Sequence, residues 1–281
     1  MNIIAKNELA ALREQKVQVL EAGFLQQEQV GCPVVHRFGP GIYIREVTIP
    51  AGTFSIGHYQ KTTHLNVMLK GRVLMCNEDG TQTELVAPQT FVCGPGRKIG
   101  HILEDMTWQN IYATDETNVE VLETMFLEKS DTWKENHKSK TLLLTCDHTE
   151  DVKDYFAVLK EFGFDHKTVR EQTENLEDQI PFPVGSYKVQ LSDSKIDGKG
   201  LFATGNFEKD EIIAPGRIDS KRTPAGRYVN HSKTPNALPI LRDNGNIDFV
   251  ALRPIAGCKG GNLGEEITID YRQALLLAKR S

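Results

Sequence analysis

Short runs of β-favouring residues, each ended after a few positions by a turn, fill the chain from residue 34 to residue 130. The turns carry glycine and proline, as in Pro50-Ala51-Gly52, Lys70-Gly71 and Gly94-Pro95-Gly96. Strands at this spacing are typical of an all-β sandwich or barrel. The pattern therefore predicts a β-barrel over residues 34–130, with Val119–Leu127 as its closing strand.

Helical periodicity flanks this block on both sides. In residues 1–33, apolar side chains recur at roughly helical spacing among Glu, Gln and Lys, which predicts an N-terminal helix. Residues 131–183 are polar and largely helical. They are expected to hold one helix over Asp151–Phe162 and a second over Asp165–Leu176, and so to form a helical connector.

A boundary is expected where the connector ends. Pro181-Phe182-Pro183 stops any helix, because proline lacks the backbone donor and restricts the residue before it. Residues 184–281 are again β-rich, and they end in a short helix expected over Gln273–Arg280. The fold class predicted for the whole chain is mainly β with a helical connector.

Composition places the chain among globular proteins. Of its 281 residues 39% are hydrophobic and 25% are charged, which excludes a wholly disordered or collagen-like chain. No apolar run approaches the ~20 residues of a membrane span, and the N-terminus carries charges where a signal peptide needs an apolar stretch. We therefore expect a cytoplasmic protein (host cytoplasm if it is viral) with no membrane partner. The five cysteines form no CxxC pair, so the sequence indicates no disulfide framework and no cysteine zinc site.

Charge is distributed unevenly along the chain. Residues 1–183 hold 18 basic and 27 acidic side chains, whereas residues 184–281 hold 15 basic and 11 acidic ones. The basic excess of the second part is too small for the dense positive stripe that nucleic-acid binding requires. No nucleic-acid partner is therefore indicated.

Three short motifs stand in order in the C-terminal block. Alone, each would be an ordinary turn or strand. Together, in this order and spacing, they resemble the SET domain, the fold of S-adenosylmethionine-dependent protein lysine methyltransferases. The resemblance spans residues 184–275. The motifs are Asp197-Gly198-Lys199-Gly200-Leu201-Phe202-Ala203, Arg227-Tyr228-Val229-Asn230-His231-Ser232 and Gly264-Glu265-Glu266-Ile267-Thr268-Ile269-Asp270-Tyr271.

The resemblance implies a minimal SET-type β-fold that binds S-adenosylmethionine and methylates a lysine of a protein substrate. By the family pattern, the Asn230 side chain would bond the amino-acid part of the cofactor, and the backbone at His231 would contact its adenine. Tyr271 would be the catalytic residue, lining the place where cofactor and lysine amine meet. The implied cofactor-binding residues are Lys199, Gly200, Leu201, Arg227, Asn230, His231 and Tyr271.

Each of these residues also has a structural interpretation. Tyr271 could be a strand-end aromatic residue in a core, and Asn230 and His231 could tie a turn by local hydrogen bonds. Arg227 could pair with a carboxylate near Glu265 or Glu266. The two glutamates could form a solvated turn.

The block is also unusually short. Only residues 204–229 separate the first motif from Asn230, which leaves almost no room for the insert that forms a substrate-groove wall in many SET proteins. The compact block is similar to viral or bacterial members of the family. An alternative function is therefore a non-catalytic structural or binding protein built on a reduced SET-like scaffold.

The N-terminal block resembles a cupin, a small β-barrel, in the order of its turns and histidines. The cues are Ile49-Pro50-Ala51-Gly52, His58, His64, Gly71, Pro95-Gly96 and His101. The resemblance implies that three imidazoles, those of His58, His64 and His101, converge inside the barrel. Three histidines can hold a divalent metal with open positions for water or substrate, whereas buried, hydrogen-bonded core histidines are the structural alternative.

The leading function expected from the sequence is a protein lysine N-methyltransferase. Its cupin-like domain would recruit the target protein or assemble a homo-oligomer. A metal-dependent cupin enzyme is the third alternative, because it would place the chemistry in the N-terminal block.

Overall fold

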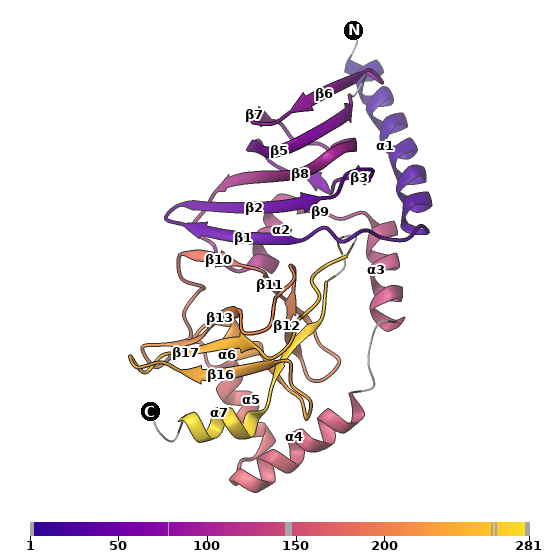
Figure 1. Cartoon of the computed structure of the whole chain (residues 1–281). Helices are drawn as coiled ribbons and strands as arrows, with labels where there is room; N and C mark the ends of the chain where they lie inside the picture. The colour runs from indigo at the N-terminus through magenta and orange to yellow at the C-terminus, as the bar shows by residue number, and fades with distance from the viewer. Residues whose placement is uncertain (1–2, 78, 144–147, 260, 262, 279–281) are drawn as a thin grey trace. The chain divides into compact units, whose positions relative to one another are not determined.

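Figure 1 shows the computed structural model, which describes residues 3–77, 79–143, 148–259, 261 and 263–278. The chain divides into two compact units, each built from several segments. Unit 1 consists of Met1–Cys32, Val47–Ile111 and Glu123–Leu144, and unit 2 of Pro33–Glu46, Tyr112–Leu122 and Thr145–Ser281. Among the described residues, no helix is long and apolar enough to cross a membrane.

Strands predominate in unit 1, between a helix at each end. Its elements are α1 (Ile3–Leu25), β3 (Phe54–Ile56), β4 (Tyr59–Gln60), β5 (His64–Cys76), β6 (Gln82–Val86), β7 (Gln89–Cys93), β9 (Leu127–Glu128) and α3 (Asp131–Leu143). The division between the units falls inside three elements, β2 (Ile42–Ile49), β8 (Ile99–Ala113) and α2 (Val119–Phe126).

The long strand β5 organises the sheet of unit 1. It pairs antiparallel with β8 on one side and with β6 and β7 on the other, and β3 adds to the other edge of β8. Gly71 bends β5 at φ +94°, and a Cβ there would lie 2.4 Å from the carbonyl oxygen of Asp105. The prediction of a mainly β chain is confirmed. The described strands follow an open order, however, and do not close into the expected barrel.

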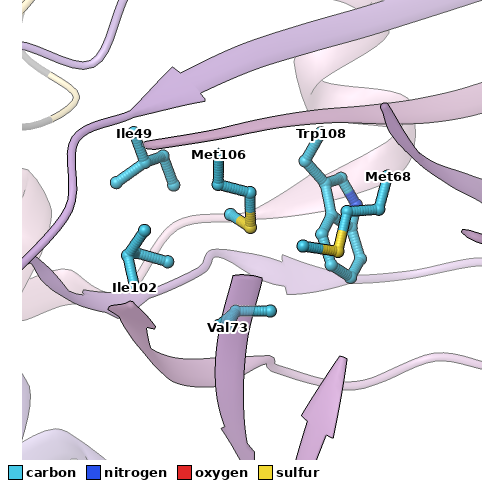
Figure 2. Close-up of a cluster of buried hydrophobic side chains, with 6 residues drawn as sticks. All are labelled: Ile49, Met68, Val73, Ile102, Met106 and Trp108. Carbon is cyan, nitrogen blue, oxygen red and sulfur yellow. The ribbon is translucent and has the colours of Figure 1, made fainter. Parts of the chain in front are cut away.

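A cluster of buried apolar side chains stabilises this sheet (Figure 2). Met68 and Val73 of β5 face Ile102, Met106 and Trp108 of β8 across the ladder, because alternate residues of paired strands lie on one face. Burial of each such side chain contributes about 1.5–3 kcal/mol. The cluster consists of Ile49, Met68, Val73, Ile102, Met106 and Trp108.

The N-terminal helix belongs to unit 1. Val17 and Leu25 of α1 are buried, and the buried Arg97 guanidinium pairs with Glu21 at 2.5 Å and with Glu14 at 3.2 Å. A buried ion pair of this kind fixes orientation more than it adds stability. The predicted N-terminal helix is thus present and packs on its own unit.

The described residues of unit 2 form short strands and five helices. They are β1 (Val34–Gly39), α4 (Thr149–Phe162), α5 (His166–Glu174), β10 (Gly185–Tyr187), β11 (Val189–Asp193), β12 (Lys199–Ala203), β13 (Ile212–Ile218), β14 (Lys221–Arg222), α6 (Pro224–Tyr228), β15 (Asn230–His231), β16 (Ala237–Leu241), β17 (Ile247–Ala251), β18 (Glu266–Ile269) and α7 (Tyr271–Ala278). The fifth helix, α2, contributes its first residues, Val119–Leu122.

Two four-stranded sheets form the centre of unit 2. One has the order β11-β12-β18-β15 and the other β14-β13-β17-β16. In the first sheet, β15 lies parallel to β18, with Asn230 opposite Thr268 and His231 opposite Ile269. Since β12 pairs with the other edge of β18, all three sequence motifs meet in this one sheet.

The connector helices form where the periodicity predicts them. Helix α4 buries Tyr155, Val158 and Leu159 and ends at Gly163, whose φ of 72° gives a left-handed cap. Helix α5 begins after Asp165, whose carboxylate accepts the Thr168 amide hydrogen.

Two expected element boundaries differ from the structure. The predicted closing strand Val119–Leu127 is helical over Val119–Phe126, because the Asn118 side chain accepts the amide hydrogens of Glu120 and Val121 and starts a helix there. The final helix starts earlier than predicted, at Tyr271. Arg280, its predicted end, lies outside the described residues.

Candidate functional site

The side chain of Asn230 joins the three motifs of unit 2. Its amide nitrogen lies 3.2 Å from the carbonyl oxygens of Asp197 and Lys199 and 2.8 Å from Oε1 of Glu266. Asn230 itself is buried. The first motif loop, the second motif and the third motif are therefore tied together at one amide group.

Glu266 is the carboxylate at this junction. The Ser194 hydroxyl donates to it at 2.8 Å, beside the bond from Asn230. Burial raises the pKa of Glu266, and the bonds from Asn230 and Ser194 oppose that rise. A Cβ on Gly200 would lie 2.2 Å from Oε1 of Glu266, so a larger residue there would displace the carboxylate from its present position. Glu266 is thus a half-buried junction residue at the start of β18, and the interpretation of a solvated turn is wrong for it.

His231 connects the second motif to the third. Its ring is fully buried, and the backbone N–H of Tyr271 donates to its Nδ1 at 3.2 Å. On the opposite side, Nε2 lies 3.0 Å from Oδ2 of Asp154. Because a backbone N–H can only donate, Nδ1 must be the acceptor. The ring proton therefore resides on Nε2 and is donated to Asp154.

Tyr271 lies at the C-terminal end of β18, where the sheet meets α7. Its hydroxyl donates to the carbonyl oxygen of Val229 at 2.9 Å. The ring packs edge-on against Tyr155 of α4 at 6.0 Å and tilts against His231 at 5.3 Å. Burial raises the pKa of Tyr271, so its hydroxyl is neutral at physiological pH.

Arg227, the first residue of the second motif, is a buried cation. It is 8% exposed, and its Nε and Nη1 have no hydrogen-bond partner among the described residues. Burial lowers its pKa. The expected alternative partners are engaged elsewhere, since Glu265 binds Arg253 at 2.7 Å and Glu266 binds Asn230. The guanidinium lies 5.0 Å from the centre of the Tyr228 ring, and an anionic ligand group would stabilise its buried charge further.

Lys199 and Leu201 contribute backbone to the site. The Lys199 ammonium pairs with Glu120 at 3.0 Å and lies 3.7 Å from Asp193, so its side chain forms ion pairs at the surface of the unit. Leu201 is fully buried in the sheet. Their neighbour Gly200 lies against Glu266, and the Lys199 carbonyl faces Asn230.

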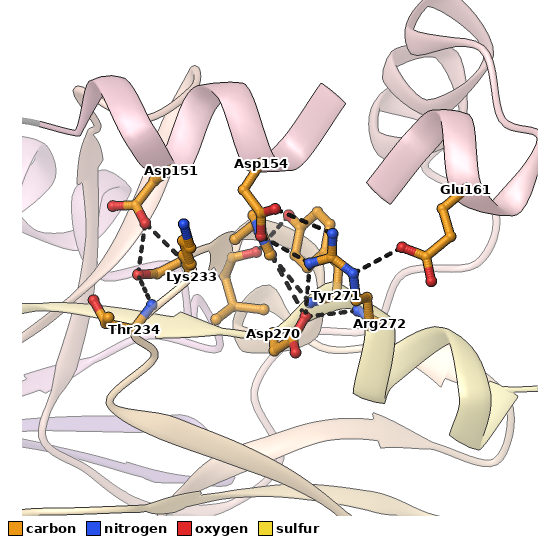
Figure 3. Close-up of polar contacts among 11 residues, drawn as sticks. Asp151, Asp154, Glu161, Lys233, Thr234, Asp270, Tyr271 and Arg272 are labelled. Carbon is orange, nitrogen blue, oxygen red and sulfur yellow. Dashed lines mark hydrogen bonds and ion pairs between the residues drawn. The ribbon is translucent and has the colours of Figure 1, made fainter. Parts of the chain in front are cut away.

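Sequence reasoning missed the contribution of α4 (Figure 3). Asp151 accepts from the Ser232 hydroxyl at 2.9 Å and from the Lys233 amide at 2.8 Å. Asp154 accepts from His231, and it also binds Arg272 at 2.7 Å. The signal available in the sequence was the pair Asp151 and Asp154, because acids three residues apart lie on one face of a helix.

The three histidines of unit 1 do not come together. His58 meets the edge of Trp133 at 4.9 Å, and His101 stacks on Phe54 at 4.2 Å. His64 Nδ1 donates to the Thr62 carbonyl at 2.9 Å, and its Nε2 faces the Lys98 ammonium at 3.2 Å.

These surroundings do not suit a metal ion. Among the described residues, no group of three His, Cys, Asp or Glu side chains is arranged to hold one. The expected convergence of His58, His64 and His101 is therefore not what the structure shows. Only His64 is the buried, hydrogen-bonded histidine of the structural alternative, whereas the half-buried rings of His58 and His101 contact aromatic side chains.

No protein-family model and no curated protein matches the chain. Among solved structures, a cupin-2 domain protein from Shewanella frigidimarina NCIMB 400 is 13% identical, with a TM-score of 0.25, over 34% of this chain and 92% of that one. A cupin domain from Bordetella pertussis Tohama I is 15% identical, with a TM-score of 0.26, over 31% and 98%.

A third solved structure differs in kind. A humanized mutant of the Chaetomium thermophilum Polycomb Repressive Complex 2, bound to the inhibitor GSK126, is 22% identical with a TM-score of 0.25. The match covers 30% of this chain and 15% of that one. TM-scores this low establish no family, so the function must be argued from the chain's own residues.

Proposed function

We propose that the protein is an S-adenosylmethionine-dependent protein lysine N-methyltransferase whose reaction centre lies in unit 2. The observation that carries the proposal is the Asn230 amide, which joins the three SET-like motifs at distances of 2.8–3.2 Å. In a non-catalytic protein built on a reduced SET-like scaffold, the three motifs would not need to meet at one side chain. The same unit holds the Tyr271 hydroxyl and the Arg227 guanidinium, whose Nε and Nη1 have no hydrogen-bond partner among the described residues.

Two features of unit 2 suit the cofactor. S-adenosylmethionine, when bound, supplies an electrophilic methyl group on a sulfonium. Arg227 would hold its carboxylate, because its Nε and Nη1 have no hydrogen-bond partner among the described residues and a guanidinium matches the geometry of a carboxylate. Asn230 and the loop of Asp197–Gly200 would hold its remaining polar groups, since glycine lets backbone approach a ligand closely.

Tyr271 would orient the reacting groups. Its hydroxyl and the Val229 carbonyl lie 2.9 Å apart, so two oxygen atoms stand side by side at the end of β18. Oxygen atoms attract polarised C–H groups weakly and can orient a sulfonium methyl in line with an incoming amine. The substrate lysine must be neutral to attack, and burial in apolar surroundings lowers the pKa of an amine.

One observation favours a second candidate, the non-catalytic scaffold. The Asn230 amide is already bonded within the protein, to two carbonyl oxygens and a carboxylate. A site whose polar groups are satisfied internally does not require a ligand for stability. The two candidates differ in whether the cofactor competes successfully for these groups.

Calorimetric titration of S-adenosylmethionine decides between them. We expect saturable binding to the wild type and a large loss of affinity in Asn230→Ala. Asn244→Ala, which alters an exposed turn, is the control and should bind as the wild type does. Absence of binding at high micromolar cofactor would refute the methyltransferase.

Transfer of labelled methyl groups to a library of lysine-containing peptides tests catalysis. We expect Tyr271→Phe to lower kcat by roughly 10²-fold or more, because it removes the orienting hydroxyl but keeps the ring. Tyr187→Phe is the matched control, since that hydroxyl also donates to a backbone carbonyl, that of Pro183 at 3.0 Å. Equal losses in both variants would show that the Tyr271 hydroxyl has only a structural role.

Unit 1 would recruit the target protein or join two copies of the chain. Leu65 and Leu69 of β5 and Val92 of β7 are exposed apolar residues of its sheet, and Leu65 and Val92 are paired in register. Sedimentation of the wild type and of a Leu69→Lys variant would measure any homo-oligomer formed through this sheet. A monomeric wild type would leave target recruitment as the role of unit 1.

A further inference from the structure

Helix α4 lies outside the three motifs, yet it supplies an acid that contacts His231 of the second motif and Arg272, the residue that follows the third. We propose that Asp154 is a positioning residue of the methyl-transfer site, acting through the His231 ring on the backbone of Tyr271. The inference deepens the proposed function and rests on it. It extends the reaction centre to a helix that the sequence presents only as a connector.

The carboxylate of Asp154 is held in one place by two cationic or donor groups. Its Oδ2 accepts from Nε2 of His231 at 3.0 Å and from Nη1 of Arg272 at 2.7 Å, and its Oδ1 accepts from Nη2 of Arg272 at 3.1 Å. The hydrogen bonds from Arg272, followed by that from His231, lower the pKa of Asp154 to about 2. Asp154 is therefore ionised at every physiological pH.

The ionised Asp154, 3.0 Å from Nε2, favours the proton on that nitrogen over Nδ1, which lies 4.0 Å from the Asp270 carboxylate. With the proton on Nε2, Nδ1 keeps its lone pair for the Tyr271 N–H. In the other tautomer, an N–H on Nδ1 would face the backbone N–H of Tyr271. The hydrogen bond that fixes the start of α7 would then be replaced by a repulsive contact.

Arg272 provides a second link between Asp154 and Tyr271. It follows Tyr271 directly in the chain, and its Nε donates to Glu161 of α4 at 2.8 Å (Figure 3). Both the ring beneath the Tyr271 amide and the next residue along the chain are thus held by Asp154. Because the backbone at Tyr271 is held in this way, the position of its hydroxyl, 2.9 Å from the Val229 carbonyl oxygen, is fixed as well.

Asp151 provides a matched control, which separates the positioning of Tyr271 by Asp154 from a role in which α4 only packs against the rest of unit 2. Asp151 lies one turn earlier on the same helix face and binds Ser232 and the Lys233 amide. It is hydrogen-bonded to neither His231 nor Tyr271 among the bonds of the described residues. If α4 only needs to be docked, Asp151→Asn and Asp154→Asn should behave alike.

The test compares Asp154→Leu, Asp154→Asn and Asp151→Asn in the full-length protein. Nitrogen-15 NMR of labelled histidine reports the tautomer of His231, and amide hydrogen exchange reports the protection of the Tyr271 N–H. We expect Asp154→Leu to give mixed tautomers and faster Tyr271 exchange. Asp154→Asn, which keeps an acceptor oxygen, should retain more of both signals, and Asp151→Asn should retain them fully.

Kinetics gives the functional readout. Asp154→Leu should lower kcat by at least roughly tenfold, the scale seen when the orienting partner of a site histidine is lost. The dissociation constant of S-adenosylmethionine should stay unchanged in it, and Asp151→Asn should keep the wild-type kcat. An unchanged kcat in a variant with altered tautomers would overturn the positioning role.

The two hypotheses fail in different ways. If the wild type neither binds the cofactor nor transfers methyl groups, the proposed function fails. The tautomer and the Tyr271 amide exchange still decide whether Asp154 positions Tyr271. Unchanged NMR signals in both Asp154 variants would overturn the inference whatever the activity.

Discussion

At the scale of single residues, the unusual group is the half-buried carboxylate of Glu266. Burial raises its pKa above the ordinary value of 4.5, although Asn230 and Ser194 donate to it. The folded state therefore binds this proton more tightly than the unfolded state does. The contribution of Glu266 to stability is fully present below pH 4.5 and is lost as the pH rises through its folded pKa.

This sign leads to a prediction for Glu266→Gln. The amide keeps an acceptor for Asn230 but cannot ionise, so the variant lacks the loss of stability above pH 4.5. We expect its free energy of unfolding to depend less on pH between about 4.5 and 8 than that of the wild type. Urea unfolding at several pH values measures the difference, and parallel pH curves for the two proteins would contradict it.

At the scale of elements, the bend in β5 depends on one glycine. Gly71 has a φ of +94° and lies against the backbone of Asp105 and Met106 on β8. Since backbone atoms cannot move aside as a flexible side chain can, Gly71→Ala must displace one strand. We expect a loss of stability of at least about 2 kcal/mol.

Gly80 and Gly39 are controls that separate the two causes of that loss, the close approach of the β8 backbone and the strain of a left-handed φ. Gly80 has a φ of +85°, but a Cβ on it would meet no described heavy atom within 4 Å, so Gly80→Ala tests backbone strain alone. Gly39 has open space and no left-handed φ, so Gly39→Ala should be almost neutral. Thermal unfolding of the three variants should rank them Gly71, Gly80, Gly39, and a different order would show that the close approach of β5 and β8 is not limiting.

At the scale of the whole molecule, ligand binding should appear as added stability. A ligand at 100 times its dissociation constant adds about 2.7 kcal/mol to the folded state. We expect S-adenosylmethionine to raise the Tm of the wild type and not that of Asn230→Ala. Zinc or nickel ions should not raise it, because His58, His64 and His101 lie in separate surroundings. A metal-dependent rise abolished by His64→Ala would contradict the structure of unit 1.

Some features follow from local sequence alone. The β-rich runs, the N-terminal helix and the helices over Asp151–Phe162 and Asp165–Leu176 were predictable, because periodicity and turn residues act over a few positions. The motif residues were recognisable for the same reason. Val119–Leu127 was mispredicted because its apolar residues suit a strand, whereas the cap at Asn118 starts a helix.

Other features were decided only by the tertiary structure. The sequence places Asp154 and His231 far apart, and only the packing of α4 within unit 2 brings them to 3.0 Å. Likewise, the spacing of His58, His64 and His101 suggests convergence, but in the folded unit their rings contact different neighbours. Local propensity determines which elements form, whereas the convergence of side chains depends on long-range packing that no short motif encodes.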